Sequence, residues 1–315
     1  MRKAIQRRLV RTRYRAGKLD PTVQGLLWTT AAGLFFVVLN TIQRVMTQQL
    51  DPFQAQFLRY ACGLLVMMPL VLRAGFAAYR PKEISGQFIR GAVHTLGLVL
   101  WYTALPKIPL ADMTAIGFTG PIFMMLGAYL FFKEPMHWDR WLASLIGFGG
   151  VMIVVAPRLS GAGGYYNLLM LASAPIFAAS FLLTKGLTRL ENAQVIVVWQ
   201  SITVTLFSLP MALLHWTHPS AGQWAGFLIS GVLGSAAHYC LTRSFSIADI
   251  SSTQSIRFLD LVWSAVFGWL IFSDVPSQTT LIGGVVICAA TVWIAHREGK
   301  RQAAPAGLTA RIPRD

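Results

Sequence analysis

The ionisable side chains Arg59, His94, His238, Arg257 and Asp260 lie well inside long apolar stretches of this 315-residue sequence. A charge at the centre of a lipid bilayer costs about 2.5–3.5 kcal/mol on insertion scales, so such groups usually face the protein interior or water. Arg257 and Asp260 are three positions apart and would share one face of a helix. They predict either an ion pair that lets the helix insert as a neutral unit or a polar stripe on the wall of a cavity.

The positions of Asp260 and Arg59 suit the binding of a charged solute. With a rise of 1.5 Å per residue, Asp260 would lie about 15 Å from the inner end of its helix, close to the midplane. A carboxylate there would bind a cationic group or accept a coupling proton, because burial favours the protonated form. Arg59, about 9 Å from the outer end of its helix, would hold a carboxylate or phosphate with its planar fork. The alternative is a structural role for Arg59, as the partner of a helix end or of Asp260.

His94 and His238 are expected at the same depth in two different helices, together with Arg257. The three would form a polar cluster at the inner gate, with the histidines acting either as hydrogen-bonded structure or as a proton relay. Aromatic side chains would stack on a planar solute, or instead pack against other helices and lipid. The candidates are Trp28, Trp101, Tyr102, Tyr239 and Trp263.

The composition indicates what kind of protein must position these residues. The sequence is 55% hydrophobic and only 12% charged, whereas soluble domains carry about 25% charged residues. A helix that spans a membrane needs about 20 mostly apolar residues, and ten such stretches follow one another with short gaps. We therefore predict an all-α integral membrane protein with ten transmembrane helices. Their expected ranges are Gly25–Val45, Phe53–Leu72, Phe88–Leu105, Met113–Phe132, Trp141–Ala156, Asn167–Leu187, Gln194–Leu214, Trp224–Leu241, Thr253–Phe272 and Thr279–Ala295.

The net charge of +15 is concentrated at the two ends and in the gaps between the apolar stretches. If the N-terminus is cytoplasmic, 22 of the 27 Lys and Arg residues lie in cytoplasmic segments, Arg90 among them, and 3 lie in outer segments. This asymmetry predicts basic cytoplasmic tails at residues 1–24 and 298–315 and an even number of spans. It favours contact with anionic lipid headgroups and argues against nucleic-acid binding, which requires a basic face on a folded domain.

The sequence lacks the patterns that most cofactors and catalytic sites require. Cys62, Cys240 and Cys288 lie inside apolar stretches, without a CxxC pair or a zinc-ligand spacing. There is no GxxxxGK motif for ATP, and the acidic residues do not cluster as a catalytic site would require. We expect no metal and no cofactor. The stretch Gly25–Val45 is long enough to span the membrane and no small-x-small cleavage site follows it, so we interpret it as a retained helix and not a signal peptide.

A shift of 140 residues brings landmarks of the two halves into register. The matched pairs are Gly91 with Gly231, Ile116 with Ile256, Phe118 with Phe258, Leu130 with Leu270, Phe132 with Phe272, and Glu134 with Asp274. Five spans per half is an odd number, so the second half must enter the membrane from the opposite side. We predict two inverted five-helix repeats, at residues 25–157 and 158–297, around a central cavity. Such repeats place a binding site near the midplane and permit alternating access.

Several short motifs are distributed over both halves. The first half contains ALPKIPLAD at 104–112, Pro121, FKEP at 132–135 and FLRY at 57–60, and the second half contains HY at 238–239, SIAD at 246–249 and FSDVP at 272–276. Over roughly residues 22 to 297 this pattern resembles the EamA-type half-repeat of the drug/metabolite transporter superfamily. The resemblance implies ten helices in two inverted repeats and secondary transport of small solutes. The sequence departs from the pattern at Leu261, the counterpart of Pro121, and at Asp274, where a glutamate is more usual.

These observations predict a secondary transporter of the bacterial inner membrane. Its partners would be the lipid bilayer and a small organic metabolite, either amino-acid-like or another zwitterionic or amphipathic solute, with protons as one candidate coupling ion. The candidate substrate and coupling residues are Arg59, His94, Trp101, Tyr102, His238, Tyr239, Arg257 and Asp260. One alternative is an integral-membrane lipid-modifying enzyme, which would need paired carboxylates at headgroup level. The other is a non-transporting scaffold, which would have a sealed core.

Overall fold

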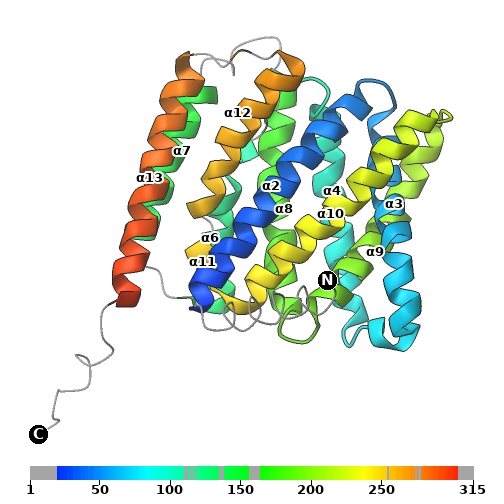
Figure 1. Cartoon of the computed structure of the whole chain (residues 1–315), viewed down its shortest axis with the longest axis horizontal. Coiled ribbons are helices and arrows are strands. Elements are labelled where there is room, and N and C mark those ends of the chain that lie inside the picture. Colours follow the sequence, from blue (N-terminus) through cyan, green and yellow to red (C-terminus); the bar gives the residue numbers. More distant parts are fainter. Residues whose placement is uncertain are drawn as a thin grey trace, which may run out of the picture.

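The computed structural model is a bundle of helices (Figure 1). It describes residues 20–109, 113, 116–117, 119–134, 138–155, 164–253, 255–273, 275 and 278–303, and within these ranges it contains no strand. The helices are α2 (Pro21–Thr47), α3 (Pro52–Ala74), η1 (Phe76–Tyr79), α4 (Ile84–Ala104), α6 (Gly120–Phe132), α7 (Trp138–Val155), α8 (Gly164–Leu187), α9 (Ala193–Leu214), α10 (Ala221–Ile247), α11 (Ile250–Thr253), η3 (Ser255–Phe258), α12 (Leu259–Phe272) and α13 (Gln278–Ala303).

Eight of the predicted spans coincide with one helix each: α2, α3, α4, α7, α8, α9, α10 and α13. Among the described helices, α2, α3, α8, α9 and α10 are long and apolar enough to cross a membrane by length and composition. Helix α13 continues to Ala303, into the range expected to be a tail. Other expectations concern residues outside the described ranges. These are the N-terminal tail up to residue 19, the end of the C-terminal tail from 304, and motif positions 110–112, Phe118, Pro135, Asp274 and Pro276.

Local capping signals set the starts of several helices. Asp20 and Asp51 each accept a backbone hydrogen bond in the first turn, Thr22 N to Asp20 at 2.8 Å and Phe53 N to Asp51 at 2.9 Å. Each aspartate is followed by a proline at the first helical position, where its missing N–H group has no cost. Ser220 and Gln223 form a reciprocal capping box at the start of α10.

The predicted continuous helix Thr253–Phe272 is wrong. The chain forms the short helix α11, then the 3₁₀ turn η3, and only then α12. The hydroxyl groups of Ser252 and Thr253 donate to the carbonyl oxygens of Asp249 and Ile250, at 2.8 and 3.0 Å. Serine and threonine side chains that bond to the local backbone compete with regular helix formation. The hydrophobicity of this stretch therefore indicated its length but not its break.

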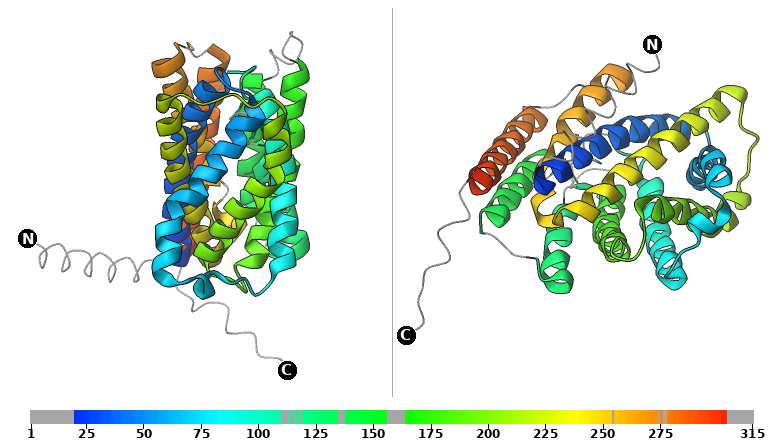
Figure 2. Two further views of the ribbon diagram at one scale, coloured as in Figure 1. Left: turned by 90° about the vertical axis from the view of Figure 1, so that its right-hand side faces the viewer. Right: turned by 60° about the horizontal axis from the view of Figure 1, so that its bottom comes forward.

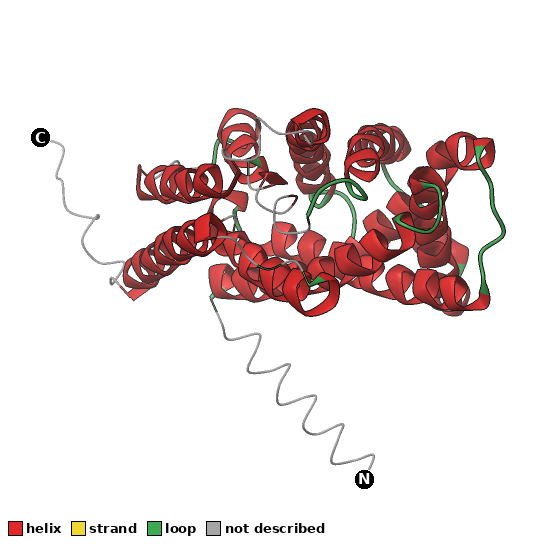
Figure 3. Cartoon of the chain, turned by 90° about the horizontal axis from the view of Figure 1, so that it is seen from above, coloured by secondary structure: helices red, strands yellow, loops and turns green. Residues whose placement is uncertain are grey.

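Helices that are distant in sequence lie side by side. Helix α2 packs along α10, α4 along α8, α3 along α9, and α7 along α13. The pair α7 and α13 forms one end of the bundle, and α3 and α9 form the other (Figures 1 and 2). Seen from above, the bundle of helices is elongated (Figure 3).

Two glycines illustrate how closely the helices approach one another. A Cβ atom at Gly231 of α10 would lie 2.7 Å from the backbone of Cys62 and Gly63 in α3. A Cβ atom at Gly91 of α4 would overlap the side chain of Thr203 in α9. Small residues at such crossings let helix backbones approach one another.

Many polar residues lie inside the bundle, and large apolar residues cover much of its outside. The side chains of Gln43, Gln54 and Gln200 are at most 1% exposed, while Leu65 and Leu214 are 61% and 72% exposed. Amide side chains are mostly exposed in soluble proteins, whereas here buried polar residues are interspersed among a larger number of buried apolar ones. This arrangement places the hydrogen-bonding groups where they can surround an internal space.

Candidate functional site: a central polar cavity

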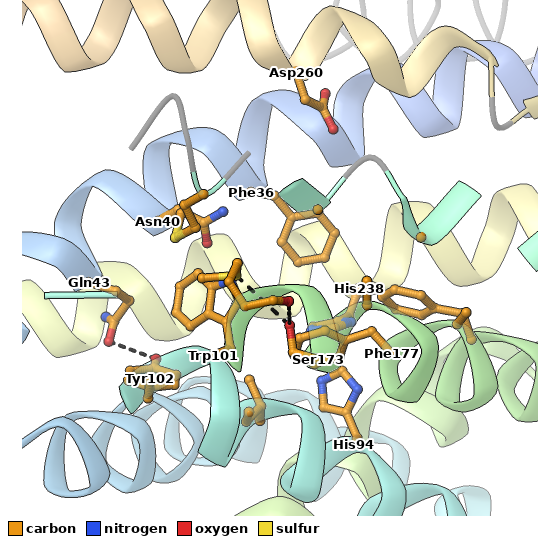
Figure 4. A pocket seen from close by; sticks show the side chains of 18 of the residues that line it. Phe36, Asn40, Gln43, His94, Trp101, Tyr102, Ser173, Phe177, His238 and Asp260 are labelled. Carbon is orange, nitrogen blue, oxygen red and sulfur yellow. Dashed lines mark hydrogen bonds between the residues drawn. The ribbon is translucent and has the colours of Figure 1, made fainter. Parts of the chain in front are cut away.

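The helices surround a cavity of about 170 Å³, whose lining side chains are shown in Figure 4. Its described lining comes from α2 (Phe36, Val37, Asn40, Gln43), α3 (Arg59, Tyr60), α4 (His94, Leu98, Trp101, Tyr102), the segment 113–124 (Met113, Gly117, Gly120, Met124), α8 (Met170, Ser173, Ala174, Phe177, Ala178, Phe181), α10 (His238), η3 (Arg257) and α12 (Asp260). Both halves of the chain contribute, so the cavity forms only when they pack together.

His94 and His238 form the centre of one wall. Their ring centroids are 5.4 Å apart, which places residues of α4 and α10 in direct contact across the bundle. His94 Nε2 is 3.0 Å from the Tyr60 hydroxyl, and His94 Nδ1 is 3.0 Å from Ser180 Oγ. His238 Nε2 is 3.3 Å from the amide nitrogen of Gln200. Both rings are buried and hydrogen-bonded, as expected for polar groups in a low-dielectric interior.

Arg90 supports this wall from behind. It lies within α4 with only 1% of its side chain exposed, so its assignment to a cytoplasmic loop was wrong. Its guanidinium donates to Thr184 Oγ1 at 2.5 Å, to Gln200 Oε1 at 2.6 Å and to the Ile196 carbonyl at 3.3 Å. These bonds join α4 to α8 and α9. Charge-assisted hydrogen bonds of this kind are stronger than neutral ones.

A second hydrogen-bonded chain crosses from α4 through α2 to α10. The Tyr102 hydroxyl donates to Gln43 Oε1 at 2.9 Å, and Gln43 Nε2 donates to Ser230 Oγ at 2.8 Å. The neighbouring Trp101 ring lies 5.0 Å from the Tyr102 ring, centroid to centroid, and also lines the cavity. Aromatic surface next to fixed polar groups is typical of sites for organic ligands.

Arg59 lies in the same wall as the histidines. Its guanidinium carbon is 4.2 Å from the centroid of the Tyr60 ring, and a cation over an aromatic face is attracted by the ring quadrupole. A Cβ atom at Gly234 of α10 would lie 3.0 Å from the Arg59 guanidinium, so Arg59 packs closely against this face of α10. The side chain is 6% exposed and faces the cavity, so it does not extend outward from the bundle.

Arg257 and Asp260 face each other on another wall. Arg257 Nε is 3.9 Å from Asp260 Oδ2, and the two side chains are 22% and 14% exposed. Asp260 is the one acidic side chain among the described residues that line the cavity. It approaches Gly33 of α2 so closely that a Cβ atom there would overlap its carboxylate. Figure 4 shows Asp260 across the cavity from His94.

The structure brings together seven of the eight predicted site residues, and Tyr239 is the exception. Its ring lies edge-on to Trp28 at 6.0 Å, and the residue packs against the apolar cluster of Met67, Val71, Val197 and Val198. Because a helix has 3.6 residues per turn, neighbouring residues point about 100° apart. Tyr239 thus lies on another face of α10 than His238, in contact with Trp28 and an apolar cluster outside the described lining. Trp28 and Trp263 are likewise absent from its described lining.

Sequence reasoning missed the uncharged polar groups of the site. Gln43 and Gln200 are central to the two hydrogen-bonded chains, and Asn40 and Ser173 line the cavity. An amide inside an apolar stretch is a detectable signal, because it too must find a hydrogen-bond partner when buried. Within the described ranges, no group of three or more His, Cys, Asp or Glu side chains could hold a metal ion.

A two-fold match defines the class of protein to which this fold and cavity belong. The model of the EamA-like transporter family matches residues 23–156 and again residues 164–295. The chain therefore belongs to the EamA-like transporter family, and the resemblance drawn from its motifs is confirmed. It is a multi-pass membrane protein of a family of small-molecule transporters.

Named relatives match nearly the whole chain. A riboflavin transporter of Rhizobium johnstonii is 33% identical over 287 residues, covering 90% of this chain and 95% of that protein. An S-adenosylmethionine uptake transporter of Rickettsia prowazekii is 26% identical and covers 90% and 96%. A pseudopaline exporter of Pseudomonas aeruginosa is 28% identical and covers 88% and 98%. One solved crystal structure shares the fold, with a TM-score of 0.71 at 17% identity, over 89% of this chain and 99% of that one.

Proposed function

We propose that this chain is a secondary transporter that moves a small zwitterionic or amphipathic metabolite across the bacterial inner membrane by alternating access. The observation that carries the proposal is the central cavity, with hydrogen-bonded histidines on one wall and an Arg–Asp pair on another. A sealed scaffold would not need charged groups facing an internal space. Buried charges are costly, and a solute that pairs with them would explain why this interior contains them.

Helix packing supports ten spans in two inverted repeats. In this scheme α2, α3, α4, the segment 113–132 and α7 match α8, α9, α10, the segment 250–272 and α13. Exchanging the halves converts the α2–α10 contact into the α8–α4 contact, and both are present. The glycine contacts follow the same exchange. Gly91 meets Thr203 and Gly231 meets Gly63, and both matched positions are 140 residues apart.

The chemistry of the lining supports the proposed solute class. Arg59 and Arg257 would pair with anionic or electronegative groups, and Asp260 with a cationic group or a proton. Trp101, Tyr60 and Phe177 offer aromatic faces to a planar part of the solute. The relatives are named for riboflavin, S-adenosylmethionine and pseudopaline, so sequence similarity alone does not identify the solute that this chain would carry. Riboflavin is the first probe because the relative named for it shares 33% identity.

The distribution of Lys and Arg supports an orientation with both ends in the cytoplasm. In that orientation the histidines would lie toward the inner side of the cavity. Asp260 would be the candidate site for a coupling proton, since it is the acidic group of the described lining.

Transport in proteoliposomes tests the proposal. Purified protein would be reconstituted with riboflavin, S-adenosylmethionine and a set of amino acids, each measured with and without a pH gradient. We expect saturable transport of at least one of these solutes. If its transport is coupled to protons, the pH gradient should drive its accumulation. Flux no greater than in protein-free vesicles for every member, with a reconstituted riboflavin transporter active in parallel, would contradict the proposal.

A further inference from the structure

Arg90, Gln200 and His238 form a line of hydrogen bonds that ends at the cavity. Arg90 NH2 donates to Gln200 Oε1 at 2.6 Å, and Gln200 Nε2 is 3.3 Å from His238 Nε2. All three side chains are at most 5% exposed. No bulk water reaches the bonds between them to replace a missing partner.

The guanidinium determines which way the Gln200 amide points. A guanidinium has only donors, so the atom that it contacts must be an acceptor. A reversed amide would place an NH₂ group 2.6 Å from Arg90 NH2, donor against donor. Gln200 therefore keeps its oxygen toward Arg90 and its nitrogen toward His238.

The orientation of the amide then determines where His238 carries its proton. The amide nitrogen only donates, so His238 Nε2 must accept and cannot bear a proton. In a neutral imidazole the other nitrogen, Nδ1, then carries the hydrogen. A doubly protonated ring would place an N–H group against the Gln200 NH₂ group.

The other groups around His238 do not favour a second proton. The rings that face it are Phe36 from α2 at 5.1 Å, Tyr60 from α3 at 6.4 Å and His94 from α4 at 5.4 Å. Arg59 lies beside it in the same wall and Arg90 lies behind Gln200, and both guanidinium groups are cationic. In the described part of the chain, no hydrogen-bond partner occupies Nδ1, although the residue lines the cavity.

We propose that Arg90 is a positioning residue that acts through Gln200 to hold His238 in the tautomer with its proton on Nδ1. His238 then offers a fixed N–H donor to the cavity and does not act as a proton carrier. This consequence rests on the proposed function. The Nδ1–H donor of His238 would favour solutes with a hydrogen-bond acceptor next to it, such as a carbonyl oxygen or an unprotonated ring nitrogen. Of the two roles open for the histidines, it assigns His238 to hydrogen bonding.

Nitrogen-15 NMR of histidine-labelled protein in lipid vesicles tests the tautomer directly, because protonated and unprotonated ring nitrogens have well separated shifts. His238 is assigned as the signal lost in His238→Asn. Without added solute, we expect a protonated Nδ1 and an unprotonated Nε2 in the wild type. In Gln200→Glu, the new carboxylate can pair with Arg90 through one oxygen and accept from His238 through the other. We expect the proton to appear on Nε2.

Two further variants separate the proposed relay from general damage to the fold. Gln200→Leu removes the donor and should leave a mixture of tautomers. Gln54→Glu places a carboxylate at another fully buried amide, which bonds to Thr217, and should leave the His238 signals unchanged. A wild-type Nε2 that bears the proton would overturn the proposal, as would an unchanged tautomer in a folded Gln200→Glu protein. The measurement needs no transported solute, so its outcome is independent of the proposed transport.

Discussion

Two walls of the cavity differ in how firmly their polar groups are held. The histidine wall (Tyr60, His94, Gln200 and His238, supported by Arg90) is joined by hydrogen bonds of 2.6–3.3 Å across α3, α4, α9 and α10. In the acidic wall (Arg257 and Asp260), the contacts among described residues are looser: the two side chains, 14–22% exposed, are 3.9 Å apart, and the Arg257 guanidinium lies 5.9 Å from the centroid of the Phe181 ring. The histidine wall therefore holds its polar groups in fixed positions for binding a solute. In the acidic wall, a solute or a proton can separate the charge pair.

The local backbone explains part of this difference. Residues of the histidine wall lie inside long regular helices. Arg257 lies in the 3₁₀ turn η3, and Asp260 lies in the first turn of α12, just after the break. Short 3₁₀ stretches between helices often mark hinges. We therefore expect changes at the acidic wall to alter transport, and changes behind the histidine wall to alter stability.

Asp260→Asn should have the largest effect on transport. Loss of a charged hydrogen-bonding partner costs about 1.5–3 kcal/mol, so the initial rate should fall roughly 10- to 100-fold, and any dependence on a pH gradient should vanish. The assay is initial flux of the transported solute in proteoliposomes. Asp20→Asn is the matched control, because asparagine also caps a helix. A wild-type rate in Asp260→Asn would remove Asp260 from the site.

Gly231→Ala should destabilise the framework behind the histidine wall. The new methyl group would lie 2.7 Å from the α3 backbone, and overpacking of this kind costs about 1–3 kcal/mol. The expected result is a lower thermal unfolding midpoint in detergent. Gly284→Ala is the control, since a Cβ atom there meets nothing within 4 Å. Equal midpoints for the two variants would show that the α3–α10 crossing is not tightly packed.

His238→Asn and His238→Gln should differ in transport. The asparagine amide nitrogen can occupy the place of Nδ1, whereas the glutamine amide nitrogen reaches the place of Nε2. A neutral hydrogen bond contributes about 0.5–1.5 kcal/mol, so the asparagine variant should retain roughly 2- to 10-fold more flux. The comparison uses initial rates normalised to reconstituted protein. A glutamine variant that is more active would assign the donor to the other nitrogen.

Gly33→Ala should have the smallest effect. Its methyl group would overlap the Asp260 carboxylate, but that carboxylate is the end of a flexible side chain and can move aside. We expect a few-fold higher KM with a near-normal unfolding midpoint, measured by concentration-dependent flux and a thermal scan. A variant that fails to fold would show that Asp260 is held as rigidly as the histidines.

The sequence predicted the helices well because the length of each apolar stretch corresponds to the length of the helix that it forms. It also identified seven cavity residues: five because a charge or histidine within such a stretch is costly unless it faces the interior, and Trp101 and Tyr102 as aromatic residues suited to a planar solute. It failed where the decisive contact is tertiary or local. Arg90 was assigned to a loop because its partners Thr184 and Gln200 lie about 100 residues away. The break before α12 was missed because hydropathy indicates the length of an apolar stretch and is insensitive to its local backbone geometry.

Access to the cavity from both sides of the membrane tests the central claim most directly. The free cysteines at positions 62, 240 and 288 would be replaced, and Asn40→Cys introduced on the α2 face of the cavity. Leu65→Cys is the control, because Leu65 is 61% exposed on the apolar exterior. We predict that a membrane-impermeant thiol reagent labels position 40 from either side, that the transported solute slows both reactions, and that position 65 stays unlabelled. Labelling from one side alone, with or without solute, would contradict alternating access through this cavity.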